Sequence, residues 1–334
     1  MFIVNSYPLA VALCVVTMLC WGSWANTMNL KPKTWPNTLF YWDYCLGIVI
    51  FTLILGLTLG SIGTNGRSFF EDLGQASGKS MGSAFLGGVI FNLSNLLFVA
   101  AAAVAGMSVA FPIAVGLALT IGVIYNYILE STGDPVILFA GVALVVLAII
   151  VNAVAYNTIP SKTKGDTRKG VILSILAGGI MGFFYGFVAD GISMDFTDPE
   201  PGLMTPYSAA FIFSIGVYLS GLLWNTYFMY RPVEGRPSTY CEYFKETSLK
   251  THISGIAGGM IWAMGFSFSI ISAEQAGPAI SYGLGQGATM VGAAWGVFVW
   301  KEFREAPKKT NWLLGGMFIF FITGLVMIIM ARNS

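Results

Sequence analysis

The segment Thr38–Gly60, TLFYWDYCLGIVIFTLILGLTLG, decides the fold class of this chain. Its only charged residue is Asp43, and the sixteen residues that follow, as far as Leu59, carry no charge. A helix of about 20 apolar residues is long enough to cross the hydrocarbon core of a bilayer. The segment therefore predicts a membrane-spanning helix with a carboxylate near one end.

The composition extends this prediction to the whole chain. Of its 334 residues, 56% are hydrophobic and only 10% are charged, with a mean hydropathy of +0.74. Soluble domains carry about 25% charged residues, so this chain could not cover a water-exposed surface. The net charge of +1 and the lack of a basic run argue against nucleic acid as a partner. We expect a multi-pass protein of the cell membrane, with the lipid bilayer as its main surroundings.

A search for apolar windows of helical length predicts an all-α membrane protein with ten spans. Two of the connections, AVAGMS and AEQAGPA, are short enough to require tight helical hairpins. The predicted spans are 7–29, 39–60, 82–104, 107–129, 135–155, 170–190, 206–229, 253–274, 277–300 and 311–331.

The distribution of cations predicts the orientation. Fourteen of the seventeen Lys and Arg residues fall in alternate connections, and only Arg67, Lys79 and Arg332 fall on the other side. Cytoplasmic loops of membrane proteins are enriched in Lys and Arg. This split predicts that both termini lie outside and that the loop between spans five and six is cytoplasmic.

An internal repeat divides the chain. Gly87-Gly88 and Gly258-Gly259 open two stretches that end at Ala105-Gly106 and Ala276-Gly277, each pair offset by 171 residues. Because five spans is an odd number, a repeated unit enters the membrane in the opposite sense, as in the inverted repeats of many secondary transporters. We predict a first five-helix repeat over 1–160, a cytoplasmic linker over 161–169, and a second repeat over 170–334.

Three amides lie deep in the predicted spans: Asn92, Asn95 and Gln286. They offer donors and acceptors without charge, which suits a neutral, polar, hydrogen-bonding solute. The alternative is that they only join helices through hydrogen bonds inside the membrane, worth about 1 kcal/mol each.

Aromatic residues occur at a similar depth, where Trp is unusual because it prefers the membrane interfaces. Their flat rings suit stacking on a planar heterocycle or on the apolar face of a sugar, and the alternative is ordinary packing. These candidates are Trp21, Trp24, Tyr185, Trp262 and Tyr282.

Two acids are candidates for proton coupling. Asp43 lies about four residues into the second span and Glu274 near the outer end of the eighth. A carboxylate in a dry site binds a proton more readily. The plainer alternative for Asp43 is a partly wet carboxylate favoured by the helix dipole.

Several stretches resemble the plant ureide permeases of the drug/metabolite transporter (DMT) superfamily. They are LCWGSWANTMNL, WDYCLG, GGVIFNLSNLLFVAAAAVAGMSV and QAGPAISYGLGQGATMVGAAWGVFVWKEFR. Seven residues match motif positions of that family: Trp24, Asp43, Tyr44, Asn95, Gln275, Gln286 and Trp295. Glu274, in contrast, stands where the family tends to have a small residue. Bacterial glucose and rhamnose uptake proteins look similar at lower specificity.

The resemblance implies ten spans in two inverted halves and proton-driven import of ureides or nucleobase-like compounds. From the residues we expect a transporter of a small neutral solute, not an enzyme, with the proton gradient as its driving force and no cofactor or metal. A sugar uptake transporter of glucose, ribose or rhamnose type is the alternative, and an exporter or passive channel shares the same fold. The sequence leaves monomer and dimer open, with a monomer as the working expectation.

Overall fold

The computed structural model describes residues 1–159, 167–233, 235–245 and 248–332. Within this part of the chain there are helices and no β-strands. The first half contains α1 (Tyr7–Ser23), the 3₁₀ helix η1 (Trp24–Leu30), α2 (Asn37–Leu57), α3 (Phe69–Gln75), α4 (Gly78–Ala105), α5 (Met107–Leu129) and α6 (Pro135–Tyr156). The second half contains α7 (Thr167–Asp190), α8 (Pro206–Tyr230), α9 (Tyr240–Lys245), α10 (Leu249–Ala276), α11 (Pro278–Gly285), α12 (Ala288–Ala294), the π-helical turn η2 (Trp295–Val299) and α13 (Thr310–Met330).

Nine helices in the described ranges are long and apolar enough to cross a membrane, which agrees with an integral membrane protein. The predicted span 277–300 is the exception. It is divided into α11, α12 and η2, with a break at Gln286-Gly287. The glycines of GLGQG lower helix propensity where the break occurs. The tenth predicted span is therefore not seen as one long helix, and ten spans in two inverted repeats remain a prediction.

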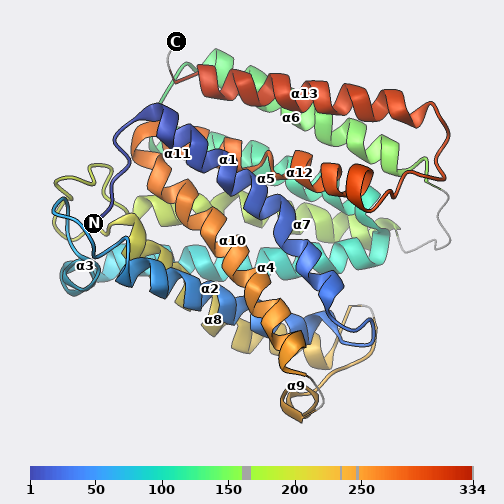
Figure 1. The fold of residues 1–334 in the computed structure, drawn as a ribbon, viewed down its shortest axis with the longest axis horizontal. Coiled ribbons are helices and arrows are strands. Elements are labelled where there is room, and N and C mark those ends of the chain that lie inside the picture. The colour runs from blue at the N-terminus through green and yellow to red at the C-terminus, as the bar shows by residue number, and fades with distance from the viewer. Residues whose placement is uncertain (160–166, 234, 246–247, 333–334) are drawn as a thin grey trace.

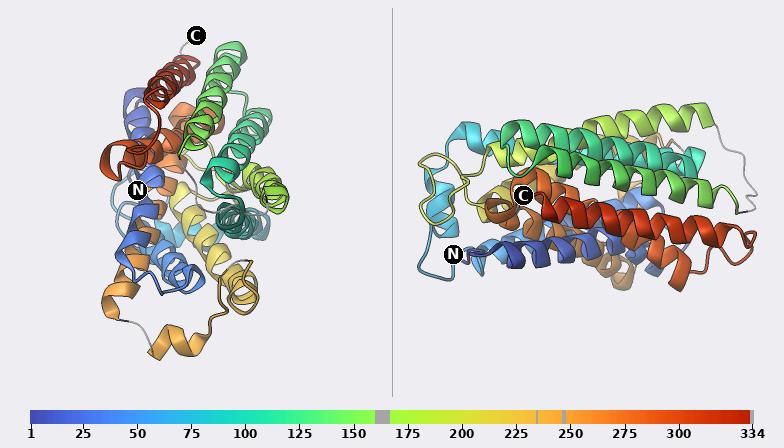
Figure 2. Two further views of the ribbon diagram at one scale, coloured as in Figure 1. Left: turned by 90° about the vertical axis from the view of Figure 1, so that its right-hand side faces the viewer. Right: turned by 90° about the horizontal axis from the view of Figure 1, so that it is seen from above.

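The predicted linker 161–169 is only partly described. Residues 161–166 lie outside the described residues, and 167–169 form the start of α7 rather than a loop. Most long helices run in one common direction, with α1 and α10 inclined across them and α6 lying along α13 (Figures 1 and 2). The start of α1 and the end of α13 lie at the same end of the molecule in Figure 1.

Helices α4 and α10 match closely. Each has 28 residues, and each begins after a serine, Ser77 or Ser248, whose side chain accepts a hydrogen bond from a backbone N–H of the first turn. Each ends at a glycine with positive φ, +81° at Gly106 and +82° at Gly277, from which the next helix starts at once. These are the two tight hairpins that the sequence predicts, and the two serines and the two glycines are each offset by 171 residues.

Glycines hold the same two helices against their neighbours. A Cβ added at Gly88 of α4 would lie 2.1 Å from the carbonyl oxygen of Phe213 in α8, and one at Gly259 of α10 would lie 2.0 Å from that of Tyr44 in α2. Small residues let helix backbones approach this closely in a membrane protein. The α4–α8 and α2–α10 contacts therefore form the frame around the interior.

One end of the bundle is closed by interlocked loops. The guanidinium of Arg67 lies 3.0 Å from Asp72 and donates to the Leu203 carbonyl at 2.7 Å, and the other oxygen of Asp72 accepts from the Thr205 N–H at 2.7 Å. The N-terminal amine of Met1 joins them through the Asn65 carbonyl. These contacts tie residues 58–77 to the loop 191–205.

The close approach at Gly259 generates a prediction. Gly259→Ala should destabilise the purified protein by about 1–3 kcal/mol, the usual cost of overpacking, because backbone cannot yield as a side chain does. The measurement is the thermal unfolding midpoint in detergent. Gly82→Ala, in α4 with no atom within 4 Å of the added Cβ, is the matched control and should be neutral or slightly stabilising. Equal midpoints for the two variants would contradict the packing assigned to Gly259.

Candidate functional site

A cavity of about 930 Å³ lies inside the bundle. Pockets for drug-sized ligands span about 300–1,000 Å³, so a small solute fits with room to spare. Of the eight residues that the sequence assigns to solute binding, five line this cavity. They are Trp21, Trp24, Asn95, Trp262 and Gln286.

Aromatic rings form the inner end of the cavity. Trp21 and Trp262 stack with ring centroids 5.8 Å apart and planes inclined by 15°, and Phe91 lies 4.2 Å from Trp262. The Trp21 indole N–H donates to the Trp262 carbonyl at 3.2 Å, which fixes the orientation of its ring. This end presents flat apolar surfaces, and the Trp21 N–H is already bonded within the protein.

Two amides add hydrogen-bonding capacity. The Asn95 Nδ2 donates to the Tyr41 hydroxyl at 3.1 Å, so Tyr41 holds the amide from behind. Gln286 stands between α11 and α12, where a turn interrupts the α-helical hydrogen-bond pattern. Its side-chain amide has no hydrogen-bond partner among the described residues. A neutral solute in the cavity would meet donors and acceptors here and aromatic faces beside them.

The other three predicted residues lie outside the cavity lining and are tied to protein partners. The Asn92 Nδ2 donates to Ser220 at 2.8 Å and joins α4 to α8. The Tyr185 hydroxyl lies between Ser269 and Ser281, and the Tyr282 hydroxyl donates to the Ala118 carbonyl at 3.1 Å.

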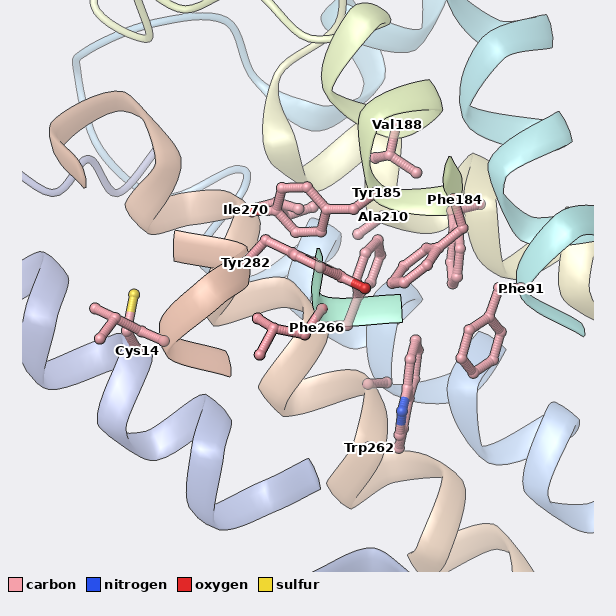
Figure 3. Packing of buried hydrophobic residues seen from close by; sticks show 14 of the residues in the cluster. Cys14, Phe91, Phe184, Tyr185, Val188, Ala210, Trp262, Phe266, Ile270 and Tyr282 are labelled. Carbon is pink, nitrogen blue, oxygen red and sulfur yellow. The ribbon is translucent and has the colours of Figure 1, made fainter. Parts of the chain in front are cut away.

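Both tyrosines are fully buried. Figure 3 shows them packed with Phe184 and Phe266, next to Trp262. This aromatic layer closes the interior beyond the inner end of the cavity.

Asp43 is almost fully buried, with 1% of its surface exposed, and it does not line the cavity. Both of its carboxylate oxygens lie 2.9 Å from Nδ1 of His252 in α10, and the Tyr243 hydroxyl of α9 donates to one of them at 2.6 Å. Burial raises the pKa of Tyr243, and the bond to Asp43 acts in the same direction, so this hydroxyl keeps its proton and donates. The three side chains join α2, α9 and α10.

Glu274 occupies a different environment. Its Oε1 accepts the Phe196 N–H at 2.7 Å, so it caps the loop 191–205 at the closed end. Its Oε2 is buried without a partner in the described part of the chain. Glu274 does not line the cavity either.

Sequence reasoning missed the polar groups at the other end of the cavity. The cavity is lined there by Lys33, Asn152, Tyr156 and Glu302. Because Lys33 and Glu302 are charged side chains, the mouth of the cavity is charged even though its interior is neutral. Asn152 lies in a predicted span and was detectable by depth alone. Glu302 follows the divided segment 278–299 in sequence. It lines the cavity only because the chain turns back after η2, which the sequence does not reveal.

These mouth residues also show where the cavity ends. Lys33, Tyr156 and Glu302 lie at or beside the connections that hold most of the Lys and Arg residues. The cavity therefore reaches the cation-rich end of the bundle, whereas the end formed by residues 58–77 and 191–205 is closed.

Comparison with known proteins identifies similar chains. The family model described as "Ureide permease" matches residues 40–169 and 161–332. Ureide permease 1 of Arabidopsis thaliana is 25% identical over 100% of this chain and 99% of its own length. A putative sugar uptake protein of Listeria innocua is 22% identical over 81% of this chain and 87% of its own. A solved crystal structure that is 15% identical, with a TM-score of 0.58 over 98% of this chain and 100% of that one, has a similar fold.

The buried Asp43–His252 contact generates a prediction about coupling. Asp43→Asn and His252→Gln, made singly and together, should show a coupling energy in the range of about 0.5–3 kcal/mol in unfolding free energy, because the residues are in direct contact. Asp43→Asn combined with Glu274→Gln, which share no partner, should be additive and serves as the control. Additive effects for the first pair would contradict a direct interaction.

Proposed function

Because the chain belongs to the ureide permease family, a family of membrane transporters and not of enzymes, we propose that it imports a small neutral polar solute of ureide or nucleobase type, driven by protons. The observation that carries this proposal is the cavity of about 930 Å³, with Asn95 and Gln286 beside the stacked Trp21 and Trp262. Planar solutes of this class present N–H and C=O groups at their edges and flat faces above and below. The amides suit the edges and the indoles suit the faces.

The proposed mechanism is rocking of two inverted five-helix halves about this cavity. The match between α4 and α10 in length, capping and offset supports such a repeat. The packing between the halves supports it too. Helix α4 of the first half packs on α7 and α8 of the second, and α10 of the second half packs on α1 and α2 of the first. The break at Gln286 fits a transporter, because irregular backbone at membrane depth is tolerated where it lines a cavity.

We assign the open end of the cavity to the cytoplasm and both termini to the outside of the cell membrane. The sequence assigns fourteen of the seventeen Lys and Arg residues to the connections beside which the cavity opens, and this supports the assignment. On this basis the structure corresponds to an inward-open state, with the aromatic layer around Tyr185 and Tyr282 as the outer closure.

Asp43 is our proposed coupling residue. Its partners Tyr243 and His252 lie on α9 and α10, so its protonation state bears on the contact of α2 with both. Protonation would remove the negative charge that holds His252, and movement between the halves would then cost less. Glu274 is the second candidate, through its hold on the outer loop at Phe196.

Sugar uptake is the alternative function, favoured by the similarity to the Listeria protein. Indole faces and amides also suit the hydroxyls and apolar faces of a sugar. Thermal-shift screening with allantoin, uracil, glucose, rhamnose and ribose separates the two, since stabilisation requires binding to the folded state.

The test of the whole proposal is uptake by proteoliposomes under an imposed pH gradient. We expect accumulation of the bound solute above the external concentration, and its loss when an uncoupler dissipates the gradient. Equilibration without accumulation would indicate a passive channel. Accumulation that the uncoupler leaves unchanged would contradict proton coupling.

Asp43→Asn provides the residue-level prediction. The amide keeps the shape of the side chain but cannot exchange a proton, so solute affinity should stay within about twofold while gradient-driven accumulation falls at least tenfold. Binding is measured by equilibrium dialysis and accumulation in proteoliposomes. Accumulation equal to that of the unaltered protein would remove Asp43 from the mechanism.

A further inference from the structure

A second polar site lies at the mouth of the cavity, built around Glu302. The Tyr156 hydroxyl donates to Glu302 Oε2 at 2.9 Å, which joins the end of α6 to the segment after η2. Glu302 is exposed at the mouth, and its Oε1 has no protein partner in the described ranges. Gly296 lies directly beside the pair, because a Cβ added there would sit 2.8 Å from Glu302 Oε2 and 2.9 Å from the Tyr156 hydroxyl.

The backbone that presents Glu302 is irregular. It follows the π-helical turn η2, and Lys301 has φ of +53°, the only positive φ of a non-glycine residue in the described part of the chain. The Glu302 N–H then donates back to the Gly296 carbonyl at 2.9 Å. π-Helical turns and left-handed residues that are not glycine concentrate at functional sites. Here both turn one carboxylate toward the cavity.

Asn152 completes the site on the α6 side. It lies one helical turn before Tyr156 and on the same face. Asn152 is only 3% exposed, yet its Oδ1 has no hydrogen-bond partner among the residues described. Leaving a buried amide oxygen unpaired costs about 1–3 kcal/mol, so a partner at this position would be stabilising.

Two indoles flank these groups. Trp295 and Trp300 stack with centroids 6.5 Å apart, and their N–H groups donate to Ser23 at 2.9 Å and to Asn26 at 2.7 Å. Because both N–H groups are occupied, the rings offer faces rather than donors. The mouth thus combines unpaired acceptors with aromatic surface.

We propose that this cluster is a second solute site, which holds a neutral solute with N–H donors before it reaches Trp21 and Trp262. The proposal rests on the proposed function and deepens it. Glu302 Oε1 and Asn152 Oδ1 are both acceptors, so the site favours a solute whose edge carries N–H groups. The carboxylate also disfavours an anionic solute.

The test compares uracil with 1,3-dimethyluracil, which has the same ring but no N–H groups. The unaltered protein should bind uracil more tightly, measured by equilibrium dialysis. Glu302→Gln should weaken uracil binding at least fivefold and narrow its advantage over the dimethyl compound, with little change in thermal midpoint. Gly296→Ala should act in the same direction by displacing the carboxylate.

Glu305→Gln is the matched control, since Glu305 is exposed like Glu302 and lies in the same loop but does not line the cavity. It should leave both affinities unchanged. If Glu302→Gln binds both compounds as the unaltered protein does, the mouth site is wrong while the transport function stands. A glucose affinity that falls in Glu302→Gln while uracil binding stays the same would overturn the assigned solute class. If the unaltered protein binds neither these solutes nor allantoin, the proposed function fails and the mouth site fails with it.

Discussion

Backbone N–H and C=O groups have no water to bond with in the hydrocarbon core of a membrane, so the chain must satisfy them within helices or beside a wet cavity. Eight of the long helices follow this constraint without interruption, and η1 prolongs α1 in 3₁₀ form. The segment from Pro278 to Val299 does not, because it is divided at Gln286-Gly287 and ends in a π-helical turn. The irregular parts of this segment, at Gln286 and at Trp295-Gly296, line the cavity. The break, the amide of Gln286 and the placement of Glu302 are thus consequences of one arrangement.

The frame and the interior have different physical characters. Glycines such as Gly88 and Gly259 bring backbones into contact and leave no space between α4 and α8 or between α2 and α10. Large aromatic side chains fill the interior near the closed end (Figure 3), whereas charged and polar side chains lie beside the indoles of Trp295 and Trp300 at the open one. A bundle of this kind moves as rigid pieces, because close-packed helices do not deform continuously. On the proposed mechanism, any change of access therefore occurs between the halves.

Hydropathy and length were sufficient to locate the membrane helices, because each span must bury about 20 apolar residues. The two hairpins followed from their few intervening residues. The break in the ninth predicted span was missed, since its window is as apolar as the others and only the glycines of GLGQG mark it.

The site was predictable in part, for a related reason. Position deep within a predicted membrane span was enough to select Trp21, Trp24, Asn95, Trp262 and Gln286, which do line the cavity. It equally selected Asn92, Tyr185 and Tyr282, which face protein partners, because depth does not reveal the direction of a side chain. Contacts between residues that are far apart in the sequence could not be predicted. The bond of Asp43 to His252 spans 209 residues and that of Tyr156 to Glu302 spans 146.

The central claim is that one solute-binding cavity opens at the cation-rich end of the bundle. Cysteine accessibility tests it most directly, with Ala288→Cys in a background that lacks the exposed Cys241, and with Lys308→Cys and Lys79→Cys as markers of the two ends. We predict that a membrane-impermeant maleimide modifies Ala288→Cys only from the side that exposes Lys308→Cys, and that a bound solute slows the reaction. Modification from the Lys79→Cys side alone, or at a rate that no solute changes, would contradict the account.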